Sequence, residues 1–92
     1  GLVLLASYPT DEINMPVLSI YGANDKVLNK EKYDEAKPLI KGNFTERVIS
    51  GGNHGQFAYY GNQSGDGKAT ISAEKQQNQT VEEMLNFITY FC

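Results

Sequence analysis

The sequence predicts an α/β fold built from three mainly parallel strands and two helices. Residues 1–6 and 17–21 are apolar at nearly every position, which is typical of strands buried on both faces of a parallel sheet. A predicted helix and a third strand, residues 44–50, follow them, and this order suits a sheet covered by helices. The last stretch of the chain has apolar residues at three- and four-residue steps, which predicts a final helix.

The connection between the first two predicted strands is short. Residues 7–11 predict a loop, and residues 12–15 leave room for at most one helical turn before Pro16. Parallel neighbours usually need a crossover of about a dozen residues or more. An irregular short crossover and an antiparallel pairing would each satisfy this link, so the sequence leaves the direction of the second strand open.

The helix between the second and third strands is predicted over about residues 30–37. Asn29 is suited to cap its N-terminus, and Glu31 lies in the first turn, where a negative charge is favoured. Pro38 should end or kink this helix because proline lacks a backbone N–H. The side chains expected to face the sheet are Tyr33 and Ala36, with Leu39 or Ile40.

The final helix follows a polar, glycine-rich stretch, residues 58–72, that predicts an irregular loop. Ser72 is suited to cap this helix, with Glu74 in its first turn. Residues 74–79 have no apolar face, so we expect this half to project into solvent. The later half has an apolar row that we expect to pack on the sheet: Val81, Met84, Leu85, Ile88 and Phe91.

Composition and charge exclude several classes of function. The 92 residues suffice for one small domain, and the formal net charge of −3 argues against a nucleic-acid partner. The longest apolar run is far shorter than a membrane span, so we expect no membrane contact by this segment. The single cysteine, Cys92, excludes an internal disulfide and leaves the cellular location open.

The chemistry of the chain centres on its only histidine, His54, in a glycine-rich loop. This loop follows the third strand, and Asp25 follows the second, so parallel strands would bring both side chains to one edge of the sheet. A carboxylate there can accept the imidazole Nδ1–H, fix the tautomer and stabilise the imidazolium. Taken singly, each residue also fits an ordinary loop role. Their matched positions favour a catalytic acid–base pair.

Two motifs resemble those of the α/β-hydrolases. Residues 16–25, PVLSIYGAND, are similar to the acid-bearing strand and turn of that fold, and residues 51–57, GGNHGQF, are similar to its histidine loop. With residues 65–72, GDGKATIS, the chain looks most like a bacterial group often called α/β-hydrolase family 5. The resemblance covers nearly all of the chain but only about the last third of a complete family member.

The resemblance implies a place in the fold and a role for two residues. Residues 1–6, 17–21 and 45–50 would be the sixth, seventh and eighth strands of the hydrolase sheet. Asp25 would be the triad acid and His54 the triad base. The chain departs from the family pattern because the nucleophile motif, G-x-S-x-G, is absent, and the oxyanion-hole groups belong to that motif and to a loop further upstream.

These features predict that residues 1–92 are the C-terminal segment of a single domain, without the N-terminal part that holds the nucleophile. Gly1, which opens directly into an apolar strand, supports this expectation. Ser7 ends a strand and is the nearest nucleophile candidate, but it lacks the flanking glycines. The missing N-terminal segment of the same protein, or a second copy of the chain, is the expected partner.

The expected function is that of an esterase-like serine hydrolase acting on a small ester-type substrate. The alternative is a non-catalytic α/β interaction module, or an inactive fragment, in which Asp25 and His54 are only loop residues. Complete family members often carry an N-terminal hydrophobic anchor, so a membrane-anchored and a cytoplasmic parent protein both stay open.

Four residues flank the catalytic candidates and are predicted to line a substrate pocket: Tyr8, Val27, Gln56 and Phe57. Phe57 also suits ordinary packing, which is favoured for its neighbours Tyr59 and Tyr60. Residues 62–67 match the first half of an EF-hand calcium loop, but its twelfth place holds Ala73, where a glutamate is needed. We therefore expect no metal and no cofactor.

Overall fold

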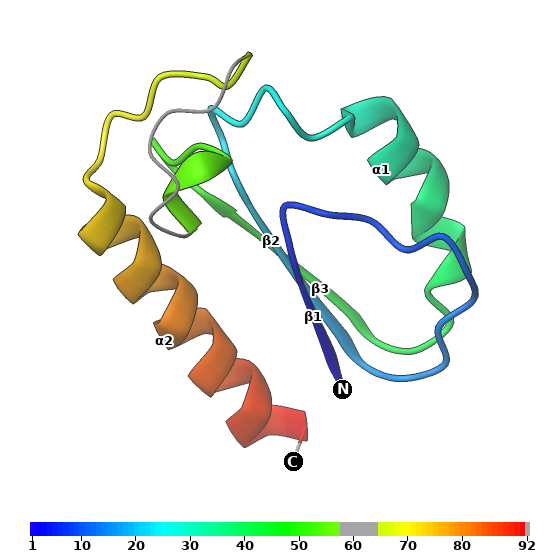
Figure 1. The fold of residues 1–92 in the computed structure, drawn as a ribbon. Helices are drawn as coiled ribbons and strands as arrows, with labels where there is room; N and C mark the ends of the chain where they lie inside the picture. Colours follow the sequence, from blue (N-terminus) through cyan, green and yellow to red (C-terminus); the bar gives the residue numbers. More distant parts are fainter. Residues whose placement is uncertain (58–64, 92) are drawn as a thin grey trace.

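The computed structural model describes residues 1–57 and 65–91, with the side chain of Phe91 left out. Three strands form one sheet: β1 (Leu2–Leu5), β2 (Val17–Gly22) and β3 (Phe44–Ile49). Their order is β1-β2-β3, and both neighbouring pairs are parallel (Figure 1). The predicted α/β class, with three parallel strands and two helices, is confirmed. The packing predicted for Tyr59 and Tyr60 lies outside the described residues.

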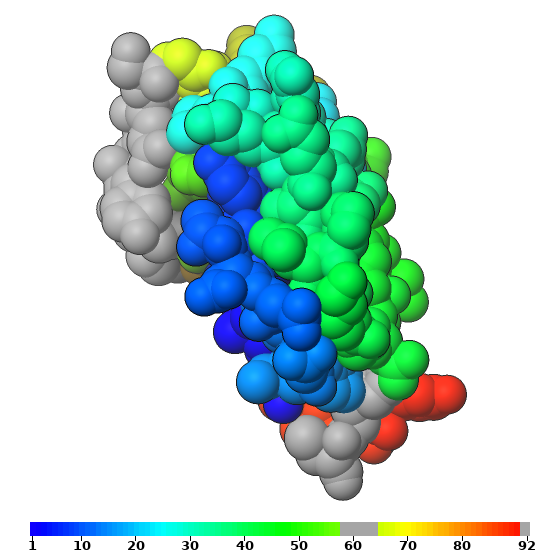
Figure 2. All heavy atoms as spheres, turned by 90° about the vertical axis from the view of Figure 1, so that its right-hand side faces the viewer, coloured from blue at the N-terminus to red at the C-terminus, as the bar shows by residue number. Residues whose placement is uncertain are grey.

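The link between β1 and β2 is an irregular crossover that runs beside α1. At its middle, Ile13 forms an isolated parallel bridge with Ile40. The Ile13 N–H donates to the Leu39 carbonyl at 2.9 Å, and the Lys41 N–H donates to the Ile13 carbonyl at 2.7 Å. Figure 2 shows this N-terminal segment, in blue, lying against the segments coloured cyan to green. These bonds hold the short crossover, and the parallel pairing of β1 with β2 excludes the antiparallel alternative.

Helix α1 (Lys30–Ala36) covers one face of the sheet and continues into the 3-10 helix η1 (Lys37–Leu39). The Asn29 side chain accepts the Lys32 N–H at 3.1 Å, which confirms the predicted cap. Tyr33 and Ala36 are buried against the sheet, as expected. The Tyr33 hydroxyl lies 2.7 Å from the Ser19 hydroxyl, so a polar contact joins this helix to β2.

Helix α2 (Ala73–Phe91) lies on the opposite face of the sheet (Figure 1). Ser72 caps it by accepting the Lys75 N–H at 3.1 Å. The apolar core between helix and sheet is formed by Leu18, Ile20, Ile49 and Phe87, with Val3, Phe57, Ile71 and Met84 packed against it. No helix in the described part of the chain has the length and apolar character needed to cross a membrane.

The rotation of α2 differs from the sequence prediction, which was wrong for three residues of the apolar row and for Gln76 in the polar half. The predicted core residues Val81, Leu85 and Ile88 are 52%, 58% and 51% exposed, whereas Met84 is partly buried and packs against the core. The packing predicted for Phe91 lies outside the described side chains. Within residues 74–79, expected to project into solvent, Gln76 is fully buried. The periodicity identified the helix, but Gln76 has backbone partners that turn its side of the helix towards the sheet.

Candidate active site

The carboxyl ends of β2 and β3 lie side by side, because Gly22 at the end of β2 pairs in register with Ile49 at the end of β3. The pairing continues past the strands. The Ala23 N–H donates to the Ile49 carbonyl at 2.9 Å, and the Asn24 N–H donates to the Gly52 carbonyl at 2.8 Å. A Cβ on Gly22 would lie only 2.4 Å from the Gly52 carbonyl carbon, so this close approach requires glycine. The turn after β2 and the loop after β3 therefore share one edge of the sheet.

Asp25 is a buried carboxylate with a partner for each oxygen. Its side chain is 1% exposed. Oδ1 accepts the backbone N–H groups of Val27 and Leu28, each at 2.8 Å. Oδ2 lies 2.9 Å from Nδ1 of His54. The turn therefore fixes the carboxylate through one oxygen and leaves the other directed at the imidazole.

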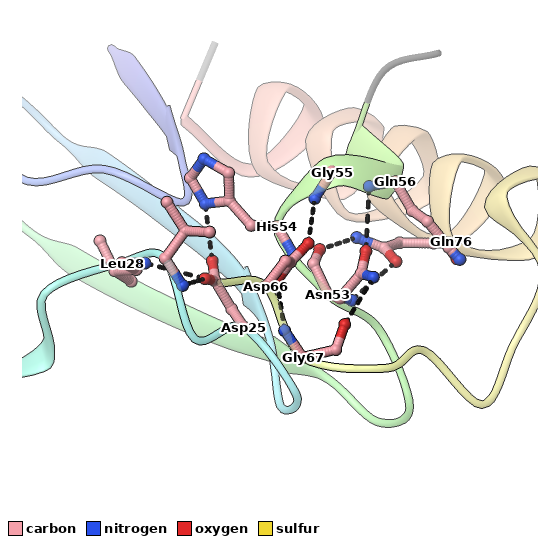
Figure 3. A network of polar contacts seen from close by, with 10 residues as sticks. Asp25, Leu28, Asn53, His54, Gly55, Gln56, Asp66, Gly67 and Gln76 are labelled. Carbon is pink, nitrogen blue, oxygen red and sulfur yellow. Dashed lines mark hydrogen bonds and ion pairs between the residues drawn. The ribbon is translucent and has the colours of Figure 1, made fainter. Parts of the chain in front are cut away.

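His54 lies at the surface of this edge, with its side chain 24% exposed. The Nδ1–Oδ2 distance falls within the roughly 2.6–3.2 Å reach of a hydrogen bond. When Nδ1–H donates to Asp25, the neutral ring carries its free lone pair on Nε2. Figure 3 shows that this second nitrogen points away from Asp25. The arrangement can take a proton at Nε2 and stabilise the resulting imidazolium.

Asn53, next to His54, joins the loop to α2. Its backbone N–H donates to Oε1 of Gln76 at 3.1 Å, and its carbonyl accepts from Nε2 of Gln76 at 2.7 Å. Its side-chain oxygen accepts the Gln56 N–H at 3.0 Å, closing the loop on itself. Figure 3 shows this network beside the imidazole. Gln76 was missed in the sequence because a polar residue in a polar stretch gives no signal of burial.

Asp66 is the second residue that sequence reasoning missed. In the sequence it stood out only within the family-like stretch of residues 65–72 and an incomplete calcium loop, whereas its carboxylate accepts backbone N–H groups. Partial burial acts to raise the pKa of Asp66, but the N–H donors of Gly55, His54, Gly67 and Lys26 together lower that pKa below its usual value. Asp66 is therefore an ionised acceptor at neutral pH, enclosed by backbone donors.

The four predicted substrate-lining residues have different surroundings. Val27 is 41% exposed and lies beside the Asp25 carboxylate that its N–H contacts. Tyr8 is half-buried after β1. Gln56 uses its side-chain NH₂ to donate to the Ile71 carbonyl at 2.9 Å, and Phe57 packs against the apolar core. Gln56 and Phe57 thus have structural roles, and a substrate contact for any of the four stays a prediction.

Metal ligands do not gather at this edge or elsewhere in the described residues, where no cluster of three or more histidine, cysteine, aspartate or glutamate side chains occurs. Residues 62–64 of the calcium-like loop lie outside the described residues. Its acidic member, Asp66, instead binds N–H groups of the histidine loop.

A parallel sheet with helices on both faces, and with an aspartate and a histidine after consecutive strands, has the arrangement of the closing part of an α/β-hydrolase domain. A family model described as "Alpha/beta hydrolase family" matches residues 1–78, and the chain belongs to that family. The matched residues include both strand ends, the histidine loop and Gln76. No curated protein and no solved structure gave a significant match.

Proposed function

We propose that this chain supplies the acid and the base of a serine hydrolase that acts on ester or related acyl substrates. The observation that carries the proposal is the 2.9 Å contact between Asp25 Oδ2 and His54 Nδ1. Membership of the alpha/beta hydrolase family supports it. The carboxylate of Asp25 is buried and the imidazole of His54 is more exposed, which suits a site in which the histidine lies between the acid and the substrate.

The proposed chemistry runs through Nε2 of His54. Nε2 takes the proton of a serine hydroxyl as the serine oxygen bonds to the ester carbonyl carbon. The imidazolium is stabilised by Asp25 and then gives this proton to the leaving alcohol as the ester C–O bond breaks. A water molecule repeats the sequence on the acyl-enzyme, releasing the acid and restoring the serine. In this scheme Asp25 stays ionised throughout.

The nucleophile is proposed to come from outside these 92 residues, because no serine of the chain stands in a G-x-S-x-G motif. The N-terminal segment of the same protein is the proposed source, with a second copy of the chain as the other. Strand β1 offers a place for this segment: it pairs with β2 on one side and has no charged residue. A parallel strand placed beside β1 would extend the sheet.

The test measures p-nitrophenyl ester hydrolysis by the complete protein that carries this chain. Asp25→Asn should lower kcat by roughly three to four orders of magnitude, because an amide no longer fixes the required tautomer. His54→Ala should lower kcat at least as much. Asp11→Asn is the matched control, since Asp11 is exposed and its carboxylate contacts only the neighbouring Glu12 N–H among the described contacts.

Two outcomes would contradict the proposal. Near-wild-type rates in Asp25→Asn and His54→Ala would favour the non-catalytic interaction module. Ester hydrolysis by the isolated 92 residues, abolished in His54→Ala, would show that the nucleophile lies within this chain after all. We expect the isolated chain to be inactive because it has a base without a nucleophile to activate.

A further inference from the structure

We propose that Asp66 is a positioning residue for the Asp25–His54 pair: its carboxylate holds the histidine loop, and its neighbours Gly67 and Lys68 contact the acid turn. The inference rests on the proposed function, since it assigns the residue that aligns the acid and base of that site. Asp66 does not touch the reacting atoms. Its carboxylate accepts backbone N–H groups of the histidine loop, and the segment that carries it contacts the turn on which Asp25 stands.

The Asp66 carboxylate accepts hydrogen bonds from two successive residues of the histidine loop. Oδ1 accepts the N–H of His54 itself at 3.2 Å, and Oδ2 accepts the N–H of Gly55 at 2.9 Å. Oδ1 also accepts the Gly67 N–H at 2.8 Å, which fixes the carboxylate relative to its own backbone. The peptide units on both sides of the His54 Cα are therefore tied to one side chain, as Figure 3 shows for Gly55 and Gly67.

The same short segment, residues 66–68, also contacts the acid turn. The backbone N–H of Lys26, directly after Asp25, also helps to lower the pKa of the Asp66 carboxyl. The Asn24 side-chain NH₂ donates to the Lys68 carbonyl at 3.0 Å. A Cβ on Gly67 would lie 1.7 Å from the Asn24 carbonyl oxygen, so the two backbones approach as closely as glycine allows.

The geometry requires a carboxylate at position 66. An ionised carboxylate has two acceptor oxygens and about four lone-pair sites, which suits donors that arrive from several directions. An asparagine would keep one acceptor and direct its NH₂ group at a backbone N–H. Charge-assisted bonds of this kind are roughly twice as strong as neutral ones. Asp66→Asn therefore preserves the shape of the side chain but removes one of its two acceptor oxygens and the hydrogen bonds made to it.

These hydrogen bonds matter because the proposed chemistry of His54 depends on the position of its ring relative to Asp25. A displacement of about 1 Å at a catalytic group can lower a rate by roughly 100-fold. Asp25 is already fixed by two N–H groups of its own turn, so a shift of the histidine loop would break the contact between Nδ1 and Oδ2. Asp66 thus prevents the movement to which the pair is most sensitive.

The test uses NMR on the 92-residue chain, where His54 is the only histidine and its ring signals are unambiguous. In the wild-type chain, the Nδ1–H held by Asp25 should give a downfield proton resonance, and the ring nitrogen shifts should report one tautomer. Asp66→Asn should broaden or abolish that resonance and mix the tautomers, while Asp11→Asn leaves both unchanged. In the complete enzyme, Asp66→Asn should lower kcat roughly 100-fold with KM unchanged.

The variants separate this inference from the proposed function. If Asp25→Asn leaves the ring resonance unchanged, the proposed acid–base pair itself is wrong. If Asp25→Asn abolishes the resonance and folded Asp66→Asn retains it with a single tautomer, only the positioning role of Asp66 is overturned.

A second measurement covers the case in which Asp66→Asn does not fold. In an acid titration of the wild-type chain, the amide protons of His54, Gly55 and Gly67 should shift together, with a midpoint below the ordinary aspartate value of 3.8. Repeating the titration in Asp25→Asn assigns the midpoint to Asp66 rather than to Asp25. Amide protons that do not move, or move with unrelated midpoints, would overturn the proposal.

Discussion

The two halves of α2 differ in what they bury: the polar N-terminal half buries polar side chains, and the more apolar C-terminal half leaves most of its apolar row exposed. In the polar N-terminal half, Gln76 is fully buried and Thr80 is 5% exposed. In the C-terminal half, Phe87 is buried at 7% exposure. The apolar row of that half is instead more than half exposed: Val81, Leu85 and Ile88. The two hydrogen bonds between the Gln76 side chain and the Asn53 backbone have therefore decided the rotation of a long helix.

The physical reason lies in the partners of Gln76. Its amide exchanges two hydrogen bonds with the backbone of Asn53, and leaving such groups buried without partners costs about 1–3 kcal/mol each. Phe87 lies eleven positions later, about three helical turns, so it shares this face. The C-terminal half packs less closely, with a groove of about 390 Å³ between it and β3.

The largest effect should come from Phe87, the buried aromatic residue of the C-terminal half. Phe87→Ala removes its ring from contact with the core and should lower the free energy of unfolding by about 3–5 kcal/mol, measured by urea denaturation. Ile88→Ala is the matched control on the exposed row and should cost less than about 1 kcal/mol. Similar losses in the two variants would break the contrast within this half.

Gln76→Leu should be next in size, although it makes the helix more apolar. It leaves the Asn53 N–H and carbonyl buried without partners, which should lower the free energy of unfolding by about 2–4 kcal/mol. The exposed neighbour Asn78 offers a control, since Asn78→Leu should leave stability nearly unchanged. A gain in stability from Gln76→Leu would mean that burial of apolar surface, and not the bonds to Asn53, holds this half.

The stability that the Asp66 carboxylate contributes should depend on pH, unlike the stability that comes from the packing of Phe87. Because backbone donors lower the pKa of Asp66 in the folded chain, its contribution to stability is fully present above the unfolded value and is lost as the pH falls through the folded pKa. Wild type should therefore be more stable than Asp66→Asn at pH 7, and the difference should shrink below pH 3.8. A difference that is equal at both pH values would exclude this linkage.

The smallest effect should come from the exposed row. Leu85 is 58% exposed, so Leu85→Asp should cost about 0.5 kcal/mol, the size of the difference in helix propensity. Amphipathic periodicity alone would predict a loss of several kcal/mol for the same change. Thermal unfolding of Leu85→Asp beside Glu74→Ala distinguishes the two, since the structure predicts small shifts for both. A large loss in Leu85→Asp would show that the row is buried in solution.

The fold and the contact between Asp25 and His54 were largely predictable from the sequence. Continuous apolar runs mark buried strands whatever their partners, and Asn29 and Ser72 act as caps through bonds to residues three positions away. Asp25 and His54 were predicted to meet because both follow strands that end at one edge. These signals are local, or depend only on the order of the elements.

Long-range polar contacts were decided only by the tertiary structure. Gln76 and Asn53 are separated by 23 positions, and no pattern in either segment indicates that a side-chain amide there will find a peptide group. The same is true of Asp66, which lies 12 positions from His54. Periodicity determined that residues 73–91 form a helix. Because hydrogen-bonding groups must find partners when buried, the loop that carries His54 determined which side of that helix faces the sheet.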